Sequence, residues 1–163
     1  MEKVNQIKKN TASLCYLPNG TLICYHHGDI VTFKDGVELL RFPLFNDKKE
    51  KILGRSKLAS RLLRLGVRAA IALDDEHILL SKGNTICELD LTNGSLSKGW
   101  FCGEGIRPLI FTEVKGIKGF DDGIYYGGYL GNMDKRPVHI YRRVGTDDWQ
   151  VIYTFTQGEI NHV

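Results

Sequence analysis

The sequence predicts an all-β fold, and three observations predict it. Short runs of β-prone residues alternate with tight-turn signals along most of the 163 residues. Eighteen glycines, with seven Tyr and seven Phe, tilt the composition towards strands and turns. The strand and turn pattern also recurs. Together these features favour a β-propeller-like array of about three four-stranded antiparallel blades, with one short inserted helix.

The first unit, over residues 12–45, begins with a strong hairpin signal. Two β-prone runs flank Pro18-Asn19-Gly20, and Asn-Gly suits a hairpin turn because both residues tolerate positive φ. Gly28-Asp29 then introduces a third run, and Asp35-Gly36 a fourth. Four short strands joined by tight turns predict an up-and-down antiparallel sheet.

The same pattern returns over residues 67–100 and again over 107–156. Comparable hairpin turns begin at Leu17, Leu73 and Phe120, which gives spacings of 56 and 47 residues. An insertion of about ten residues in the first interval brings both spacings near the ~40–50-residue period of propeller blades. The alternative is a single β-sandwich or meander whose turns have this spacing.

Residues 46–66 interrupt the β pattern and predict the inserted helix. Leucines at i, i+4 and i+7 form one helix face, with Ser56 and Gly66 as caps. Eight basic and two acidic residues give 46–68 a charge of +6, against −3 for the remainder. The basic stripe is a candidate interaction surface, and a solvated surface helix is the alternative. The stripe consists of Lys57, Arg61, Arg64 and Arg68.

Charge and apolar content weigh against several classes of function. The net charge of +3 is too small to indicate nucleic-acid binding. No apolar run approaches the roughly 20 residues of a transmembrane helix, and residues 1–10 lack the apolar core of a secretory signal. The four cysteines form no C-x-x-C pair, which indicates reduced thiols in a cytoplasmic protein. A Cys15–Cys24 disulfide across the first hairpin is the alternative.

The third unit carries residues that resemble a known family. The segments 107–109, 122–129, 138–141, 149–155 and 158–163, together with Asn132 and Arg136, are similar to bacterial sialidase-like propellers with BNR repeats. In sequence these segments read Arg-Pro-Leu, Asp-Gly-Ile-Tyr-Tyr-Gly-Gly-Tyr, Val-His-Ile-Tyr, Trp-Gln-Val-Ile-Tyr-Thr-Phe and Gly-Glu-Ile-Asn-His-Val. The resemblance covers about 105–163 and extends only diffusely to the first two units.

This sequence departs from the family pattern in two places. The turn 144–149 keeps the Asp and Trp of the family's Asp-box but not their usual order. Gly128 stands where such sequences often have an acid. A sialidase-like site gathers arginines, an acid and a tyrosine nucleophile from blades around the channel, so this chain holds at best half of one. The resemblance therefore leaves the catalytic residues unknown.

Candidate ligand residues follow from where propellers bind, near the innermost strands at one end of the channel. Arg107 precedes the first strand of the third unit, where its guanidinium fork suits an anionic sugar's carboxylate; its alternative role is to bridge blades. Tyr129 and Asn132 lie in a Gly-rich turn that suits sugar stacking and hydroxyl binding, unless it serves backbone geometry alone. The full candidate set is Arg107, Tyr129, Asn132, Arg136 and His162.

Neither a metal nor a cofactor is expected. His26 and His27 are adjacent on a strand and point to opposite faces. Glu159 and His162 are three residues apart, a spacing that also places two side chains of a strand on opposite faces. The pairs Asp74-Asp75 and Asp121-Asp122 recur at the same hairpin turn, 47 residues apart, which is typical of turn formers rather than of a general acid and base.

Residues 1–163 are thus expected to form a single partial propeller domain. Three units leave apolar outer faces that soluble monomers rarely expose, so we expect self-association, as by two chains about a two-fold axis, or missing C-terminal blades. Three functions stay open: binding of a glycan or sugar precursor in surface-polysaccharide metabolism, a glycoside hydrolase or lyase completed by missing blades or a second chain, and a protein-interaction scaffold.

Overall fold

A computed structural model describes residues 11–45 and 66–160 of the chain. Within these ranges twelve strands form three four-stranded sheets, every strand pair is antiparallel, and no helix occurs. The predicted all-β class and the three antiparallel four-stranded units are confirmed. The predicted helix at 56–66, with Lys57, Arg61 and Arg64, lies outside the described residues, apart from Gly66.

The first sheet has the order β1-β2-β3-β4 and follows the predicted turns. Asp35 and Gly36 both have positive φ, 51° and 79°, the backbone of a type I′ hairpin turn. His27 and Gly28 repeat this arrangement with φ of 50° and 93°. The strands of this sheet are β1 Thr11–Tyr16, β2 Leu22–His26, β3 Asp29–Lys34 and β4 Val37–Pro43.

The second sheet has the order β5-β6-β7-β8, and its last strand has only two residues. The Asp90 carboxylate shapes the turn after β7, where it accepts hydrogen bonds from the Thr92 amide and the Asn93 side chain, both at 2.7 Å. Arg68 lies in β5 and is exposed. The strands are β5 Val67–Ala72, β6 His77–Lys82, β7 Thr85–Asp90 and β8 Trp100–Phe101.

The third sheet has the order β9-β10-β11-β12. A register shift between Ile140 and Tyr141 marks a bulge in its longest strand pair, β11 and β12. Trp149 is buried near the start of β12. The strands are β9 Thr112–Val114, β10 Gly123–Gly127, β11 Val138–Gly145 and β12 Asp148–Phe155.

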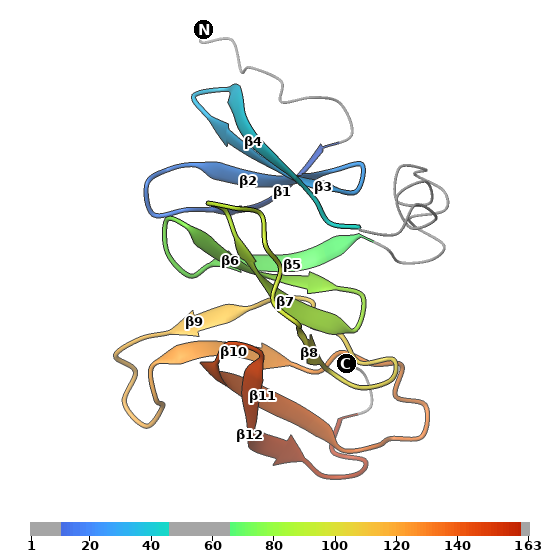
Figure 1. Ribbon diagram of the computed structural model, residues 1–163. Coiled ribbons are helices and arrows are strands. Elements are labelled where there is room, and N and C mark those ends of the chain that lie inside the picture. The colour runs from blue at the N-terminus through green and yellow to red at the C-terminus, as the bar shows by residue number, and fades with distance from the viewer. Residues whose placement is uncertain (1–10, 46–65, 161–163) are drawn as a thin grey trace, which may run out of the picture.

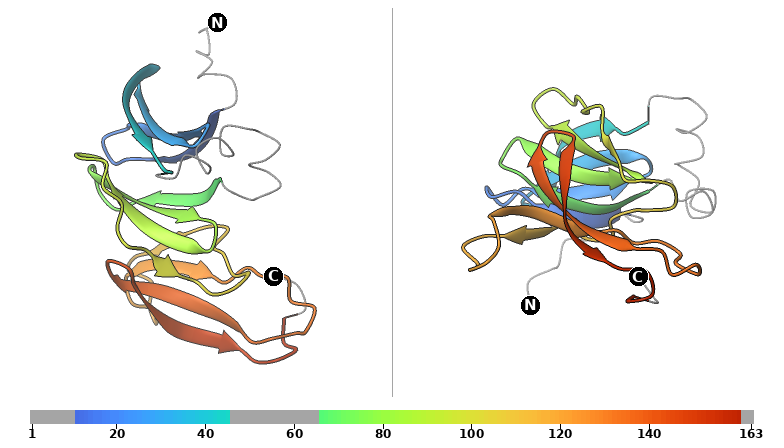
Figure 2. Two further views of the ribbon diagram at one scale, coloured as in Figure 1. Left: turned by 45° about the vertical axis from the view of Figure 1, so that its right-hand side comes forward. Right: turned by 90° about the horizontal axis from the view of Figure 1, so that it is seen from below.

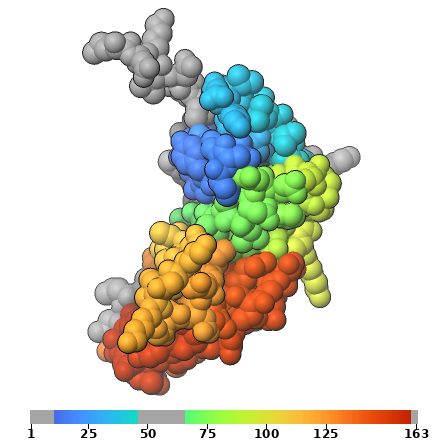
Figure 3. Space-filling model, turned by 90° about the vertical axis from the view of Figure 1, so that its left-hand side faces the viewer, coloured from blue at the N-terminus to red at the C-terminus, as the bar shows by residue number. Residues whose placement is uncertain are grey.

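The three sheets stack face to face in chain order, as Figures 1 and 2 show. The first strands of the first and second sheets meet, since β1 contacts β5. The stack is elongated, with the first sheet at one end and the third at the other (Figure 3). The second sheet is therefore the one described sheet with a neighbouring sheet on each face.

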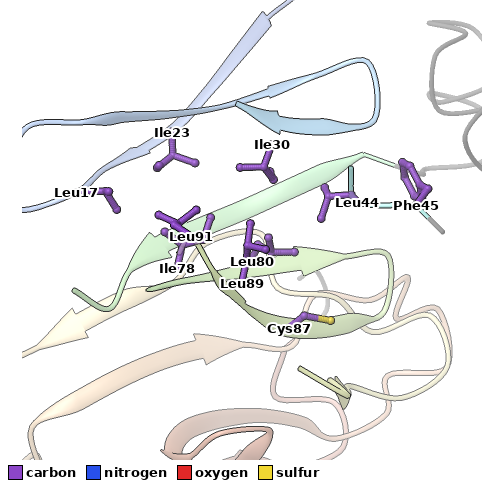
Figure 4. Close-up of a cluster of buried hydrophobic side chains, with 10 residues drawn as sticks. All are labelled: Leu17, Ile23, Ile30, Leu44, Phe45, Ile78, Leu80, Cys87, Leu89 and Leu91. Atoms are coloured by element: carbon purple, nitrogen blue, oxygen red, sulfur yellow. The ribbon is translucent and has the colours of Figure 1, made fainter. Parts of the chain in front are cut away.

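An aliphatic core joins the first and second sheets (Figure 4). Ile23 and Ile30 of the first sheet point towards Ile78 and Leu80 of the second, and all four are fully buried. Leu79, between them in β6, belongs to the other core because successive strand residues point to opposite faces. A continuous apolar run in β6 is thus what a strand needs when both of its faces are covered.

An aromatic core joins the second and third sheets. Tyr126 of β10 stacks on Tyr141 of β11 at 4.7 Å between ring centres and meets Trp149 edge-on at 4.8 Å. The Trp100 indole donates a hydrogen bond of 3.2 Å to the Tyr126 hydroxyl, which gives that buried oxygen a partner. Leu79 and Ile86 complete the contact from the second sheet.

Candidate functional site

The structure brings Arg107 and Tyr129 together. Their backbones form an isolated antiparallel bridge with two hydrogen bonds of 3.0 Å. This bridge extends the pairing of β9 with β10 at the end away from their connecting loop. The Arg107 guanidinium carbon lies 5.3 Å from the centre of the Tyr129 ring, within the range of a cation–π interaction. Both side chains are half-buried, so each keeps part of its surface open.

Asn132 has a structural role in the following loop. Its side chain is buried; its Oδ1 accepts a 2.7 Å hydrogen bond from the Arg136 amide, and its Nδ2 donates to the Arg136 carbonyl at 2.9 Å. A third contact, of 3.5 Å, reaches the Ile160 carbonyl. Both ends of the Asn132 amide therefore serve the loop that follows Tyr129. The Arg136 side chain is exposed, and His162 lies outside the described residues.

The backbone at Gly128 is closely packed. A Cβ atom at this buried position would lie 3.1 Å from Ile106 Cγ2 and 3.7 Å from the His139 carbonyl oxygen. Ile106 would have to shift by a few tenths of an ångström to accept a side chain here. Glycine therefore fits this close approach of Ile106 and the His139 carbonyl to the backbone before Tyr129.

Asp147, in the turn between β11 and β12, has a structural role. Asp147 has a positive φ of 53°, and its carboxylate accepts hydrogen bonds from Ser97 Oγ at 2.6 Å and from the Gly99 amide at 2.9 Å. The turn between β11 and β12 is thereby tied to the second sheet. The sequence identified the aspartate but not its partners, which are 50 and 48 residues away.

A polar groove of about 520 Å³ lies between the second and third sheets. On one side, the Asp74 carboxylate bonds the Glu76 and His77 amides at 2.7 Å, as expected of a turn former, and also contacts His77 Nδ1 at 3.0 Å. On the other side, the Arg143 guanidinium donates two hydrogen bonds to the Glu88 carboxylate, from Nη2 at 2.6 Å and from Nε at 3.0 Å. Sequence reasoning missed Glu88 and Arg143, because 55 residues separate them.

Most of the cysteine thiols are shielded from solvent, and one histidine ring contacts a neighbouring strand. All four cysteines are free thiols, and three of them are buried. Burial raises the pKa of Cys15 and Cys102 to about 11, so neither thiol is a ready nucleophile near neutral pH. His26 Nδ1 lies 2.9 Å from Thr11 Oγ1. Among the described residues, no group of three or more metal-ligating side chains is suitably placed.

An apolar groove of about 570 Å³ lies on the outer face of the third sheet. Phe120 and Tyr153 are its most open rings, exposed to 59% and 51%. Asp121, in the loop before β10, pairs with Arg142, and its carbonyl accepts a 2.6 Å hydrogen bond from the Tyr125 hydroxyl. The complete lining is Val114, Gly119, Phe120, Asp121, Tyr125, Ile140, Ile152, Tyr153 and Phe155.

The first sheet at the other end of the stack has a small buried cluster of its own, in which Cys24 and Val31 are fully buried and Leu22 and Phe33 nearly so. Arg41, which is paired in register with Val31, binds Asp29 at 2.9 Å and Glu38 at 2.8 Å. The edge strand β4 nevertheless exposes the apolar side chains of Val37, Leu39 and Leu40. Both end sheets therefore keep exposed apolar residues.

Comparison of the sequence with protein-family models and with curated proteins finds no match. The described parts of the chain contain no helix of the length and apolar character needed to span a bilayer. Functional inference therefore starts from the geometry of the sites described above.

Proposed function

We propose that this chain is a sugar-binding module, formed by three blades of a sialidase-like β-propeller. In this proposal it binds a glycan or sugar precursor of surface-polysaccharide metabolism at the Arg107–Tyr129 pair. The observation that carries the proposal is the half-buried guanidinium lying over a half-buried aromatic ring at the start of the third sheet. We further propose a cytoplasmic location, since all four thiols are free.

The order of strands supports the propeller part of the proposal. In each sheet the four strands follow one another in sequence, and β1 contacts β5 at the first-strand side. Face-to-face packing through two separate cores is the way in which propeller blades bury their faces. In such an array the Arg107–Tyr129 bridge lies where the chain enters the innermost strand of a blade, a usual position for ligand-binding residues.

The chemistry of the pair suits an anionic sugar. A guanidinium recognises a carboxylate through two parallel hydrogen bonds, each charge-assisted contact being worth about 1.5–3 kcal/mol. The Tyr129 ring supplies a flat apolar surface and a hydroxyl. Asn132 holds the loop that follows Tyr129 through its hydrogen bonds to Arg136.

A titration with N-acetylneuraminic acid, followed by NMR, tests the proposal. We expect the amide signals of Arg107 and Tyr129 to shift, and Arg107→Gln to weaken binding about tenfold or more through loss of a charged hydrogen bond. Uncharged N-acetylglucosamine should bind more weakly. Lys98→Gln, which removes an exposed charge on the second sheet, serves as the matched control.

Two results would overturn the sugar site. One is a saturating titration that leaves the Arg107 and Tyr129 signals in place, and the other is an equal loss of affinity in Lys98→Gln. Turnover of a chromogenic sialoside that disappears in Arg107→Gln would instead favour the glycoside hydrolase.

The interaction scaffold is the second candidate function, and the apolar groove on the third sheet is the observation that favours it. We propose that this face is covered in the working assembly, by self-association or by further blades, because contiguous exposed apolar surface marks a contact site. The predicted basic stripe at Lys57, Arg61 and Arg64 remains a proposed contact surface on residues that the structure does not describe.

A further inference from the structure

We infer that Asn19 is a site of spontaneous modification, at which the chain converts an asparagine into isoaspartate and thereby loosens the contact between the first and second sheets. The inference does not depend on the sugar site. It starts from two Asn-Gly pairs in turns, Asn19-Gly20 and Asn93-Gly94. Both asparagines are exposed, so water reaches each of them.

The reaction needs only the asparagine, the glycine that follows it and water. The Gly20 amide nitrogen gives up its proton and attacks the side-chain Cγ of Asn19, and the bond from Cγ to Nδ2 breaks, so that ammonia leaves. Water then opens the resulting succinimide ring at either carbonyl. One opening gives aspartate, and the other gives isoaspartate, whose main chain runs through Cβ and Cγ. Glycine favours the attack because it has no side chain to shield its nitrogen.

The hydrogen bonds of the two asparagine side chains differ. In both, Oδ1 accepts a bond from the backbone amide two residues on, from Thr21 at 2.9 Å and from Ser95 at 2.7 Å. Asn93 Nδ2 also donates to the Asp90 carboxylate at 2.7 Å. Asn19 Nδ2 has no such partner among the described residues. The nitrogen that must leave is therefore held at Asn93 and open to solvent at Asn19.

The room around the two attacking glycines differs in the same sense. Each glycine amide donates one backbone hydrogen bond, of 2.9 Å at Gly20 and 2.8 Å at Gly94, so this bond does not distinguish the sites. An added Cβ at Gly20 would have nothing within 4 Å, whereas one at Gly94 would lie 2.7 Å from Cδ1 of Phe42 in the first sheet. Ring closure moves the glycine backbone, and Phe42 restricts this movement at Gly94. Both observations therefore select Asn19.

Modification of Asn19 acts on the contact between two sheets. The Asn19 amide nitrogen donates a 2.8 Å hydrogen bond to the Asp75 carboxylate in the loop between β5 and β6. Isoaspartate lengthens the main chain of the turn by a methylene group and adds a carboxylate there, which the Asp75 carboxylate repels. Both changes work against the hydrogen bond between Asn19 and Asp75. We expect the hairpin of β1 and β2 to separate more readily from the second sheet.

Peptide mapping by mass spectrometry of the whole chain, after incubation in mildly alkaline buffer, tests the choice of site. Asn19 should convert about tenfold or more faster than Asn93, the effect of one additional charge-assisted hydrogen bond at Asn93. In concentrated urea the two rates should become similar, because the contacts of the fold are gone. Conversion of Asn93 as fast as that of Asn19 in the folded chain would overturn the inference. So would a folded chain that keeps both asparagines while urea converts both.

The stability of the modified chain tests the consequence. Ion exchange separates it from the parent, because the new carboxylate adds a negative charge. The isoaspartate form should melt about 2–4 °C below the fresh chain, as expected for loss of one hydrogen bond in a protein of this size. Asn19→Ser, which has no amide to lose, is the matched control and should keep its melting temperature through the same incubation. An isoaspartate form that melts with the fresh chain would also overturn the inference. Sugar binding at Arg107 is independent of these results.

Discussion

Asp147 joins two sheets with a single carboxylate. It occupies the left-handed region at φ 53°, which aspartate tolerates better than most residues, and it accepts hydrogen bonds from Ser97 and Gly99 of the second sheet. The residue therefore serves both its own hairpin and the contact between sheets. Replacing it tests how far the two sheets depend on polar contacts.

Asp147→Ala should lower the free energy of unfolding by about 1–3 kcal/mol, because the Gly99 amide and the Ser97 hydroxyl lose their acceptor. Urea denaturation measures the change. Asp148→Ala, at the exposed neighbouring position, should cost less. Equal effects of the two substitutions would show that the bridge contributes nothing of its own.

His77 and Asp74 make the second sheet sensitive to pH. The hydrogen bond to Asp74 raises the pKa of His77, so protonated His77 stabilises the fold below the ordinary value of 6.5. That stabilisation is lost as the pH rises through the raised folded-state value. Hydrogen bonds from Glu76 and His77 lower the pKa of Asp74, so its contribution is lost only as the pH falls through that lowered value.

Asp74→Asn should bring the pKa of His77 back towards its ordinary value, because the amide can still accept the turn hydrogen bonds but carries no charge. An NMR titration of the His77 ring measures the change. The difference in melting temperature between about pH 5 and about pH 8, on either side of the ordinary histidine pKa, should shrink as well. A His77 titration that is unchanged in Asp74→Asn would contradict this account.

The candidate residues show which site features can be predicted from sequence. Local rules identified Asp74 as a turn former, but they placed Tyr129 in a Gly-rich turn, whereas its backbone forms a β-bridge with Arg107. They did not show that the side-chain amide of Asn132 hydrogen-bonds the backbone of Arg136, although the two residues are only four apart. They also missed the Glu88–Arg143 pair, because partners from different sheets are set by stacking rather than by spacing.

At the scale of single elements, hairpins were predictable and bulges were not. Turn chemistry is local, so Asp35-Gly36 specifies a type I′ turn by itself. The bulge near Ile140 and the two-residue length of β8 depend on how the strand fits the neighbouring sheet. Gly99, just before β8, shows this dependence at one position.

Gly99→Ala should destabilise the second sheet strongly. Its φ is +92°, and an added Cβ would lie 2.5 Å from Thr85 Cγ2 and 2.9 Å from Cys87 Sγ. The backbone strain costs about 1–2 kcal/mol and the overpacking about 1–3 kcal/mol more. Gly83→Ala is the matched control, because its φ is also positive, at 59°, but nothing lies within 4 Å of the added atom. Chemical denaturation should show a clearly larger loss for Gly99→Ala than for Gly83→Ala.

At the scale of the whole molecule, the number of units was predictable but their contacts were not. Repeated turns specify three sheets, because each turn acts within its own unit. Which face of a sheet meets which neighbour depends on contacts far apart in the chain, such as Ile23 with Ile78. The continuous apolar run of β6 is the one local sign that the second sheet lies in the middle.

This arrangement predicts that the two ends of the stack respond separately to mutations in the middle sheet. Leu80 belongs to the core shared with the first sheet, and Leu79 to the core shared with the third. Each truncation to alanine should cost about 2–5 kcal/mol. In a linear array, where each unit contacts only its neighbours, the damage should stay on the side of the lost contact. Hydrogen exchange should therefore accelerate in β1–β4 for Leu80→Ala and in β9–β12 for Leu79→Ala. Equal acceleration at both ends in both variants would mean that the three sheets unfold as one unit.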